Sequence, residues 1–586
     1  MLLSIRDLNV HFSTPDGDIH AVRNVSLDIP EGSCLGVVGE SGSGKSQLFL
    51  GAMGLLSANG RATGSVLYRG EEILGTRKVH ALRGSKITMI FQDPLTSLTP
   101  HMTIGNQVME ALGRHMPREE ARLRVREMLD YVRIPEAARR MAQYPHELSG
   151  GMRQRVMIAM ATITGPDLVI ADEPTTALDV TVQAQILEIL RALKSEKHTA
   201  MALISHDMGV IAGNADRVAV MRHGEVVEEG AVDLIFFAPA HAYTRMLLDA
   251  MPRIDKGEPN HTATGAKLLA VKDLQVSFPV AQGPFRKPKQ LRAVDGVNFE
   301  LAEGETLGIV GESGSGKSTI ARAVLQLLPA NGGNVVWLGR DLSQETQAEI
   351  RKARKDFQIV FQDPLASLDP RQPVGVSIAE PLKALMPGLA RDDIRARVRA
   401  MMDKVGLDPA WINRYPHELS GGQNQRVGIA RAMIVEPRMV ICDEAVSALD
   451  VSIQAQIVAL IKHLQAQTGL SLIFISHDLS VVRQLAHRVM VLYLGRVVEM
   501  ASSAALYRQP RHPYTRALLS AVPTPDPRAE RAKKRVLLAG DPPSPLDRRA
   551  QLSFLKSRLG EDNPDAEQYR PQLLEVEPGH FVAEFD

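Results

Sequence analysis

The feature that most constrains this chain is an internal repeat. Five motifs occur twice in the same order along the 586 residues, and each returns about 270 positions later. The pairs are GESGSGKS at 39–46 and 311–318, IFQDPLTSLTP and VFQDPLASLDP from Ile90 and Val360, YPHELSGG from Tyr144 and Tyr415, IADEPTTALDV and ICDEAVSALDV from Ile170 and Ile441, and ISHDM and ISHDL from Ile204 and Ile475. Solenoid repeats have periods of about 20 to 50 residues, so two copies of this length indicate a duplicated domain.

The composition of the chain suggests where these copies begin and end. Residues 252–266, PRIDKGEPNHTATGA, are polar, contain Pro and Gly, and lack hydrophobic periodicity, as a linker does. We therefore predict a first domain over 1–251, a second over 267–522 and a C-terminal extension over 523–586.

The hydrophobic pattern predicts the same α/β architecture in both copies. Apolar residues alternate with period two, which is typical of antiparallel strands, at Leu8, Val10 and Phe12 and at Val25, Leu27 and Ile29. Continuous apolar runs, typical of strands covered on both faces, occupy 34–38, 168–171 and 200–204. A helical period follows at Val125, Met128, Leu129 and Val132, and in the second copy at Ile394, Val398, Met401, Met402 and Val405. Each copy is thus predicted to have an antiparallel lobe and an inserted helical lobe.

Charge and cysteine content narrow the class of protein. With 68 Lys and Arg against 67 Asp and Glu, the whole chain offers no electrostatic reason to bind nucleic acid or an anionic membrane. No apolar stretch approaches the roughly 18 residues of a membrane-spanning helix, and the first ten residues do not resemble a signal peptide. We expect a cytoplasmic protein. Its two cysteines, Cys34 and Cys442, lie in apolar runs and are interpreted as small core residues.

The octapeptide GESGSGKS fits the phosphate-binding pattern G-x-x-x-x-G-K-[ST] and lies between an apolar run and a helical stretch in both copies. Its glycines let backbone N–H groups turn toward a phosphate, and the following helix adds its positive end. A Gly/Ser-rich turn would be the simpler interpretation of one copy, but not of two. The expected ATP-binding residues are Gly39, Ser41, Gly42, Ser43, Gly44, Lys45, Ser46 and Gln47, and Gly311, Ser313, Gly314, Ser315, Gly316, Lys317, Ser318 and Thr319.

Two adjacent carboxylates end an apolar strand in each copy. After a phosphate-binding loop, the first, Asp172 or Asp443, is expected to hold Mg²⁺ together with Ser46 or Ser318. The second, Glu173 or Glu444, is expected to orient or deprotonate the attacking water. Taken alone, such a pair would be a strand end capped by solvated acids.

Leu-Ser-Gly-Gly precedes an amphipathic stretch at Ser149 and at Ser420, where the serine would cap a helix. Alone, this is an ordinary N-cap. Combined in fixed order with the phosphate loop, FQDP, the acidic pair and ISHD, it resembles the signature of ATP-binding-cassette (ABC) ATPases. The resemblance covers nearly the whole chain, twice.

This resemblance implies that the two cassettes dimerise head to tail and that each ATP is shared. One site would combine the first phosphate loop with Ser420, Gly421 and Gly422, and the other the second loop with Ser149, Gly150 and Gly151. Gln92 and Gln362 match the glutamine that reaches Mg²⁺ and the water, and His206 and His477 match the switch histidine, so they join Glu173 and Glu444 as catalytic candidates. Asp179 and Asp450 match the loop that crosses the dimer interface.

Some positions depart from the family pattern. Asn424 stands where the first copy has Arg153 and the family usually has a basic residue, so the site at Ser420 is a candidate for weaker activity. The aromatic residue that stacks on adenine has two candidates, Phe12 and Phe278, with His20 in the same segment, but a core-facing strand position is the favoured interpretation of both.

The ends of the halves indicate a branch of the family. HAYTRMLLDAMP from His241 and HPYTRALLSAVP from His512 resemble the dipeptide, oligopeptide, nickel and glutathione import branch, and the fused arrangement is most similar to the double-cassette ATPases of glutathione and of peptide and microcin C uptake. No cysteine follows Cys442, so no iron–sulfur site is expected in the tail.

The expected function is that of an ATP-hydrolysing, energy-coupling subunit of a peptide importer, using ATP and Mg²⁺. The resemblance implies two transmembrane permease subunits, an extracytoplasmic binding protein that acts through them, one chain per transporter with its halves forming the ATPase dimer, and a peripheral place on the inner face of the cell membrane. A tandem ABC ATPase acting on ribosomes or DNA is the alternative; its usual charged linker or coiled-coil insertion is missing. A non-hydrolysing regulatory module is disfavoured by the intact acidic pairs.

Overall fold

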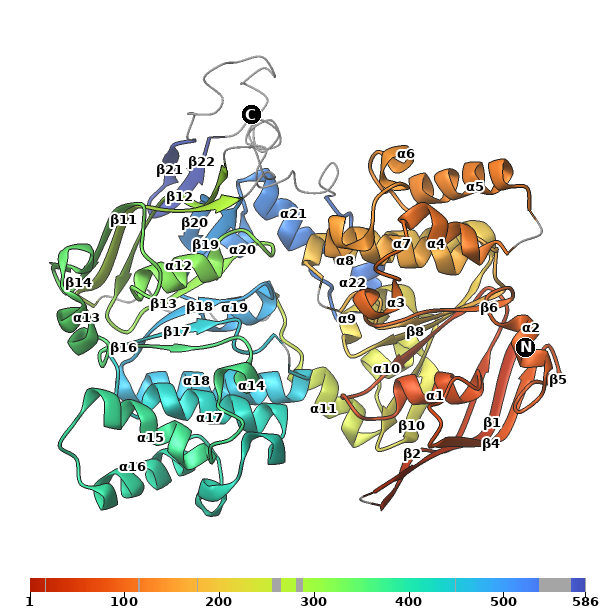
Figure 1. Cartoon of the computed structure of the whole chain (residues 1–586), viewed down its shortest axis with the longest axis horizontal. Coiled ribbons are helices and arrows are strands. Elements are labelled where there is room, and N and C mark those ends of the chain that lie inside the picture. Colours follow the sequence, from red (N-terminus) through yellow and green to blue (C-terminus); the bar gives the residue numbers. More distant parts are fainter. Residues whose placement is uncertain are drawn as a thin grey trace. The chain divides into compact units, whose positions relative to one another are not determined.

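The computed structural model describes residues 1–15, 17–113, 116–176, 178–255, 265–280, 288–447, 449–536 and 571–584. The chain forms two compact units (Figure 1). Unit 1 comprises Met1–Met251, Asp450–Ser452 and a segment that begins at Pro523, and unit 2 comprises Pro252–Leu449, Ile453–Val522 and the chain from Asp541 on. Most of the predicted linker and a large part of the predicted extension lie outside the described residues.

The antiparallel lobe of unit 1 is a four-stranded sheet in the order β2-β1-β4-β5. Its strands are β1 (Leu3–Thr14), β2 (Gly17–Ile29), β4 (Gly60–Tyr68) and β5 (Glu71–Glu72). The predicted alternation is confirmed, because Leu8 pairs with Val25 and both side chains are buried in one hydrophobic core. Polar side chains of β1 and β2 form hydrogen bonds and an ion pair between the two strands.

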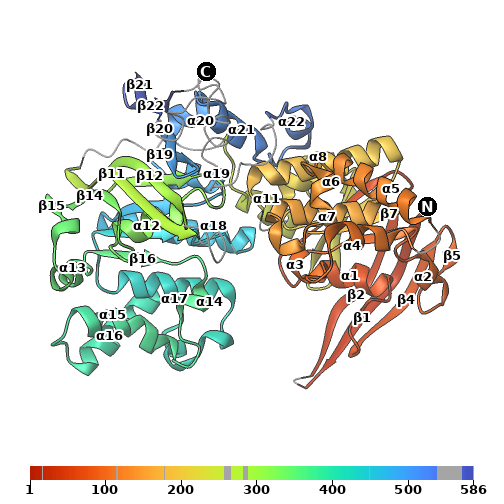
Figure 2. The same cartoon turned by 45° about the horizontal axis from the view of Figure 1, so that its top comes forward.

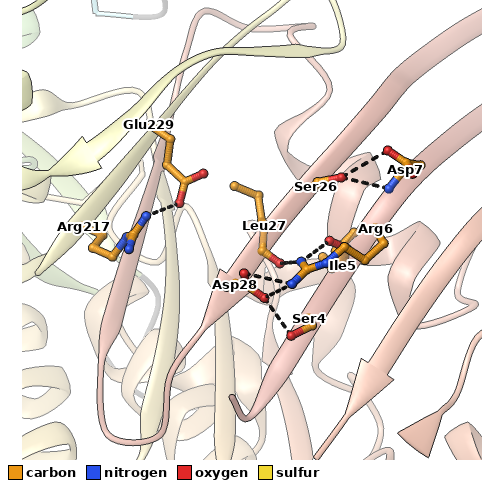
Figure 3. Close-up of polar contacts among 9 residues, drawn as sticks. All are labelled: Ser4, Ile5, Arg6, Asp7, Ser26, Leu27, Asp28, Arg217 and Glu229. Atoms are coloured by element: carbon orange, nitrogen blue, oxygen red, sulfur yellow. Dashed lines mark hydrogen bonds and ion pairs between the residues drawn. The ribbon is translucent and has the colours of Figure 1, made fainter. Parts of the chain in front are cut away.

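Figure 3 shows these polar bridges. Arg6 of β1 donates to Asp28 of β2 at 2.8 Å, and Ser4 donates to the same carboxylate at 2.7 Å. Arg217 and Glu229, on two strands of the neighbouring sheet, pair at 2.8 Å. Arg6 is half exposed, so its ion pair adds little stability and serves mainly to align the strands.

The second sheet of unit 1 has six strands in the order β10-β9-β3-β8-β7-β6, parallel except for the β9–β10 pair. These strands are β3 (Cys34–Val38), β6 (Ile87–Ile90), β7 (Leu168–Asp172), β8 (Ala200–Ser205), β9 (Arg217–Arg222) and β10 (Glu225–Ala231). Every residue of β3, β7 and β8 is buried, which confirms the strands predicted from continuous apolar runs. Cys34 lies in this core, where burial raises the pKa of its thiol to about 12.

Helices cover this sheet and form the inserted lobe. Those outside the lobe are α1 (Lys45–Ala52), α2 (Lys78–Leu82), α8 (Val180–Lys197), α9 (Met208–Asn214), α10 (Val232–Phe237) and α11 (Ala242–Ala250). The lobe itself contains α3 (Pro94–Ser97), α4 (Ile104–Ala111), α5 (Arg118–Tyr131), α6 (Ala137–Arg140), the short helix η1 (Pro145–Glu147) and α7 (Gly150–Thr162). Val125, Met128 and Leu129 form the buried face of α5, as the helical period predicts.

A short helix from the C-terminal region completes unit 1. This helix, α22 (Pro527–Ala532), packs on α9, where Arg531 donates to the carbonyl oxygen of Ala215 at 2.6 Å. Glycine at position 213 makes room for it, since an added Cβ would lie 2.7 Å from Glu530 Cγ. Residues that directly follow the second cassette in sequence therefore belong to the first unit.

Unit 2 repeats this architecture. Its antiparallel sheet, in the order β12-β11-β14-β15, comprises β11 (Lys267–Val280), β12 (Lys289–Ala302), β14 (Gly332–Trp337) and β15 (Arg340–Asp341). The strands of its second sheet are β13 (Thr306–Val310), β16 (Phe357–Val360), β17 (Met439–Asp443), β18 (Ser471–Ile475), β19 (Arg488–Tyr493), β20 (Arg496–Ser502), β21 (Leu573–Glu577) and β22 (His580–Ala583). The helices of the second half are α12 (Lys317–Val324), η2 (Leu342–Gln344), α13 (Gln347–Ala353), α14 (Pro364–Ser367), α15 (Val374–Leu385), α16 (Arg391–Lys404), η3 (Pro409–Asn413), η4 (Pro416–Glu418), α17 (Gly421–Met433), α18 (Val451–Thr468), α19 (Leu479–Leu485), α20 (Ser503–Arg508) and α21 (Pro513–Ala521).

One addition distinguishes the second sheet from the first. Its order is β16-β17-β18-β13-β19-β20-β22-β21, so a C-terminal hairpin extends the edge beyond β20 (Figure 2). His580 of β22 contacts Glu499 of β20 at 2.7 Å, and both side chains are buried. The corresponding edge strand of unit 1, β10, has only β9 as a strand neighbour among the described residues.

Candidate functional site

Each unit has the predicted glycine-rich loop between a buried strand and a helix. In unit 1 the loop joins β3 to α1, and in unit 2 it joins β13 to α12. Two glycines are required in each: an added Cβ at Gly39 would collide with the carbonyl oxygen of Met221, and one at Gly44 with that of Ala21. Gly44 has φ 96° and directly precedes α1, whose free N–H groups face the loop.

The lysine of each loop is buried and held by the loop's own carbonyl groups. Lys45 Nζ donates to the carbonyl oxygens of Gly39 and Glu40 at 2.8 and 2.9 Å, and Lys317 Nζ donates to those of Gly311 and Glu312 at the same distances. Burial lowers the pKa of Lys45, and the nearby Glu173 carboxylate opposes that shift. The ammonium group of each lysine is therefore held by two backbone carbonyl oxygens of its own loop.

The hydroxyl that follows the lysine meets the first carboxylate of the acidic pair. Ser46 Oγ donates to Asp172 Oδ1 at 2.9 Å, and Ser318 Oγ donates to Asp443 Oδ1 at 2.8 Å. Burial raises the pKa of both aspartates, while the serine hydroxyl opposes that rise. A hydroxyl and a carboxylate side by side are the oxygen ligands that Mg²⁺ binds next to a nucleotide's phosphates, so these residues fit the ion.

Each loop also contains a buried hydroxyl that none of the described residues pairs with. Among those residues Ser43 Oγ and Ser315 Oγ have no hydrogen-bond partner, and both side chains are almost completely buried. Unpaired buried hydroxyl groups are rare in folded proteins and call for an explanation. Phosphate oxygens in the loop would supply the missing acceptor.

The second carboxylate of unit 1 is held by three side chains from separate segments. Gln92 Nε2 and Thr176 Oγ1 each donate to Glu173 Oε2 at 2.9 Å, and His206 Nδ1 lies 3.3 Å from Glu173 Oε1. The backbone of Glu173 has φ 45°, an uncommon conformation for a residue other than glycine. The structure thus brings together the predicted glutamine, glutamate and histidine.

Unit 2 has the corresponding glutamine, glutamate and histidine, but two of the contacts differ. Gln362 Nε2 donates to Glu444 Oε2 at 2.8 Å, and His477 Nδ1 lies 3.5 Å from the same oxygen. Glu444 also has a positive φ, 50°. Ser447, which corresponds to Thr176, donates instead to the backbone carbonyl oxygen of Glu444 at 2.9 Å. Thr176 was not identified from the sequence. A hydroxyl residue three positions after the glutamate in both copies, Thr176 and Ser447, is the signal that could have indicated it.

The charges of these clusters follow from their contacts. Burial raises the pKa of Glu173, but the hydrogen bond and charge of His206 and the hydroxyl of Thr176 outweigh it, so the net shift is downward. Burial also raises the pKa of Glu444, but the hydrogen bond and charge of His477 outweigh it, so the net shift is again downward. The hydrogen bond with the glutamate raises the pKa of both histidines. The glutamates are therefore ionised at neutral pH.

The two signature serines cap their helices as predicted, but not equally. Ser149 Oγ accepts from the N–H of Met152 at 3.2 Å. Ser420 Oγ accepts from the N–H of Gln423 at 3.3 Å, and Gln423 Oε1 accepts from the N–H of Ser420 at 2.9 Å, which makes a complete capping box. Met152 occupies the position of Gln423 and has no side-chain oxygen to accept a hydrogen bond. The first signature therefore has only the serine half of the capping box. The role of Ser149, Gly150, Gly151, Ser420, Gly421 and Gly422 toward nucleotide stays a prediction.

Asn424 has a defined structural role beside this box. Its Nδ2 donates to the carbonyl oxygens of Pro416 and Leu419 at 2.9 and 3.2 Å, which fastens the segment before Ser420 to α17. Phe12 and Phe278, the candidates for stacking on adenine, are partly buried and pack against hydrophobic cores, the placement favoured for them as strand residues.

Comparison with known proteins agrees with this geometry. A family model described as "ABC transporter" matches residues 22–176 and 294–447, and one described as "Oligopeptide/dipeptide transporter, C-terminal region" matches 227–274 and 498–550. The chain is 44% identical to the "Glutathione import ATP-binding protein GsiA" of Salmonella paratyphi A, over 99% of this chain and 96% of that protein. Its identity to the protein of that name from Escherichia coli K12 is also 44%, over 100% of this chain and 97% of that protein.

Within the described part of the chain, none of the helices combines the length and hydropathy that crossing a membrane requires. The duplicated phosphate loops, the carboxylate clusters and the two pairs of family matches all describe the same kind of molecule. The chain belongs to the ATPase family of ABC transporters, in its double-cassette form with the oligopeptide/dipeptide transporter C-terminal region in each half.

Proposed function

We propose that this chain is the ATP-hydrolysing subunit of a peptide importer and that each phosphate loop, with the carboxylate cluster beside it, binds and hydrolyses one ATP. The observation that carries the proposal is the occurrence, in both units, of a cluster of glutamine, glutamate and histidine beside a buried loop lysine. Neither unit lacks a group that hydrolysis needs, so both are proposed to be active.

The residues have distinct roles in this proposal. Lys45 and Lys317 bind phosphate oxygens, and the ionised Glu173 and Glu444 accept a hydrogen bond from the attacking water and orient it. Gln92 and His206 hold the two carboxylate oxygens of Glu173, and Gln362 and His477 both contact Oε2 of Glu444. Ser46, Gln92 and Asp172, and likewise Ser318, Gln362 and Asp443, would hold Mg²⁺, which when bound neutralises charge on the phosphates.

The importer role has its own support. Membrane permeases are the partners that an import ATPase requires, and the relatives are named for glutathione import. We propose two permease subunits per chain, a separate extracytoplasmic binding protein, a position at the inner membrane face, and a short peptide such as glutathione as the transported class. The division into cassettes at 1–251 and 267–522, joined by 252–266 and followed by an extension, is part of this proposal.

The catalytic assignment is tested with the double variant E173Q/E444Q. Glutamine keeps the size and the hydrogen-bonding shape of glutamate but does not accept a proton, so we expect kcat to fall by about 100-fold or more while ATP binding persists. The matched control is E225Q, which neutralises an exposed carboxylate at the start of β10 and should keep the wild-type rate. An unchanged rate in the double variant would show that other groups carry the chemistry.

The importer assignment is tested separately by purifying the tagged chain from its own cells. Copurification with membrane permeases is expected, whereas ribosomes or DNA as the bound material would support the alternative function. A thermal-shift screen of the cognate binding protein against glutathione, other short peptides and Ni²⁺ then distinguishes the substrates.

A further inference from the structure

A tyrosine hydroxyl contacts the phosphate loop in both units. The N–H of Glu40 donates to Tyr243 Oη at 3.2 Å, and the N–H of Glu312 donates to Tyr514 Oη at 3.2 Å. Each tyrosine is the third residue of the HAYT or HPYT motif and lies in the first turn of α11 or α21, about 200 residues after the loop. Both side chains are almost completely buried.

The peptide unit that meets the tyrosine also holds the loop lysine. The N–H of Glu40 and the C=O of Gly39 belong to one planar trans peptide, so they point in opposite directions. Its N–H donates to Tyr243, and its carbonyl oxygen accepts from Lys45 Nζ at 2.8 Å. The Gly311–Glu312 peptide is held between Tyr514 and Lys317 in the same way. Each tyrosine therefore fixes the orientation of the peptide plane on which the lysine rests.

A glutamate and a histidine hold the backbone that leads into each tyrosine. Glu228 of β10 accepts from the N–H groups of Ala240 and His241 at 2.7 and 3.1 Å, and His241 Nδ1 accepts from the N–H of Tyr243 at 3.1 Å. In unit 2, Glu499 of β20 accepts from the N–H groups of Arg511 and His512, and His512 Nδ1 accepts from the N–H of Tyr514.

The last residue of a neighbouring strand also fixes each tyrosine ring. Arg222 of β9 lies over the ring of Tyr243 at 4.8 Å, and the ring of Tyr493 of β19 lies 4.3 Å from that of Tyr514. The two halves thus use different chemistry at equivalent positions to keep the ring in one place. Such a constraint on the ring keeps the hydroxyl aimed at the loop in both units.

We infer that Tyr243 and Tyr514 are positioning residues for ATP binding, acting through the phosphate-loop peptide that orients the lysine. The inference rests on the proposed role of these loops in binding ATP. It gives a physical task to the motif by which each half resembles oligopeptide and dipeptide transporters, since the tyrosine of that motif connects the end of the cassette to the beginning of its nucleotide site. Neither tyrosine contacts the reacting atoms, so binding should depend on them more than the chemical step does.

The test uses the full chain with the double variant Y243F/Y514F, which keeps both rings and removes both hydroxyl groups. Loss of one neutral hydrogen bond that pre-organises a loop should raise the KM for MgATP, and the Kd measured in the E173Q/E444Q background, by about three- to tenfold. kcat should stay within about twofold, because the carboxylate clusters are untouched. The control Y131F removes the hydroxyl by which the partly buried Tyr131, at the end of α5, donates to Glu196, and it should change neither constant.

Three outcomes separate the possibilities. A lower melting temperature with unchanged KM and Kd would mean that the tyrosines only stabilise the fold, and would overturn the inference. A fall in kcat with unchanged KM would overturn it as well. The variant K45A/K317A tests the underlying role of the loops: if it binds ATP as the wild type does, the proposed ATP site is wrong, whereas loss of binding there with no effect of Y243F/Y514F refutes the tyrosine role alone.

Discussion

The buried contact between Glu499 and His580 should stabilise unit 2, and the variant H580A measures how much free energy of unfolding it contributes. Glu499 is completely buried and accepts from two backbone N–H groups, at Arg511 and His512, in addition to His580 Nε2 at 2.7 Å. Alanine removes one of three donors to a buried carboxylate and with it a side-chain contact between β22 and β20, while the backbone pairing of the two strands remains. A hydrogen bond to a charged group contributes about 1.5–3 kcal/mol, and breaking a buried pair costs about 3–5 kcal/mol, so we expect a loss of about 3 kcal/mol.

Scanning calorimetry of the full chain measures this loss. A unit of this size loses about 2–4 °C of melting temperature per kcal/mol, so the transition of unit 2 should fall by about 6–12 °C while that of unit 1 stays in place. H580Q keeps an N–H donor and should recover part of the difference, and H463A, at an exposed site on α18, should have no effect. If H580A and H463A melt alike, the hairpin is not held through Glu499 and the reasoning fails.

Two further predictions concern the carboxylate cluster and a buried histidine. T176V removes a donor to Glu173, and kcat should fall about three- to tenfold, whereas S447A removes only a bond to a backbone carbonyl and should leave kcat within about twofold; equal effects in a steady-state ATPase assay would contradict the asymmetry. Burial lowers the pKa of His512 to about 4, below its ordinary value of 6.5, so its neutral form stabilises the folded state fully above pH 6.5 and that stability is lost as pH falls toward 4. At pH 5, urea unfolding should show a loss of about 2 kcal/mol relative to pH 7 that H512N, whose amide can still cap α21, does not show; parallel pH profiles would refute this.

Much of the architecture could be predicted because its signals are local. The repeat defines two copies of one domain, period two and continuous apolar runs identify the strands, and the phosphate loop requires a strand before it and a helix after it. Gln92, Glu173 and His206 are far apart in sequence, and only the family resemblance placed them together before the structure did. Their prediction therefore depended on motif order rather than on periodicity.

The contacts that could not be predicted join distant segments without a shared pattern. β22 pairs with β20, whose Glu499 lies 81 residues before His580. The alternation of polar and apolar residues in a strand of four residues does not indicate which strand it pairs with. Thr176 and Ser447 are similar hydroxyl residues at equivalent positions, and only rotamers distinguish the carboxylate from the backbone carbonyl as acceptor. Met152 and Gln423 differ visibly in sequence, but their effect depends on cap geometry that periodicity does not report.

The packing of α22 on α9 has a consequence for how the protein is made. A ribosome synthesises α9 more than 300 residues before Arg531, which donates to the backbone just after that helix. The surface of α9 that contains Gly213 stays uncovered while all of the second cassette is being translated, so unit 1 matures only after most of unit 2 has emerged. Both units therefore wait for the end of the chain, unit 1 for α22 and unit 2 for β21 and β22, and a chain that stopped at Val522 would leave both halves unfinished.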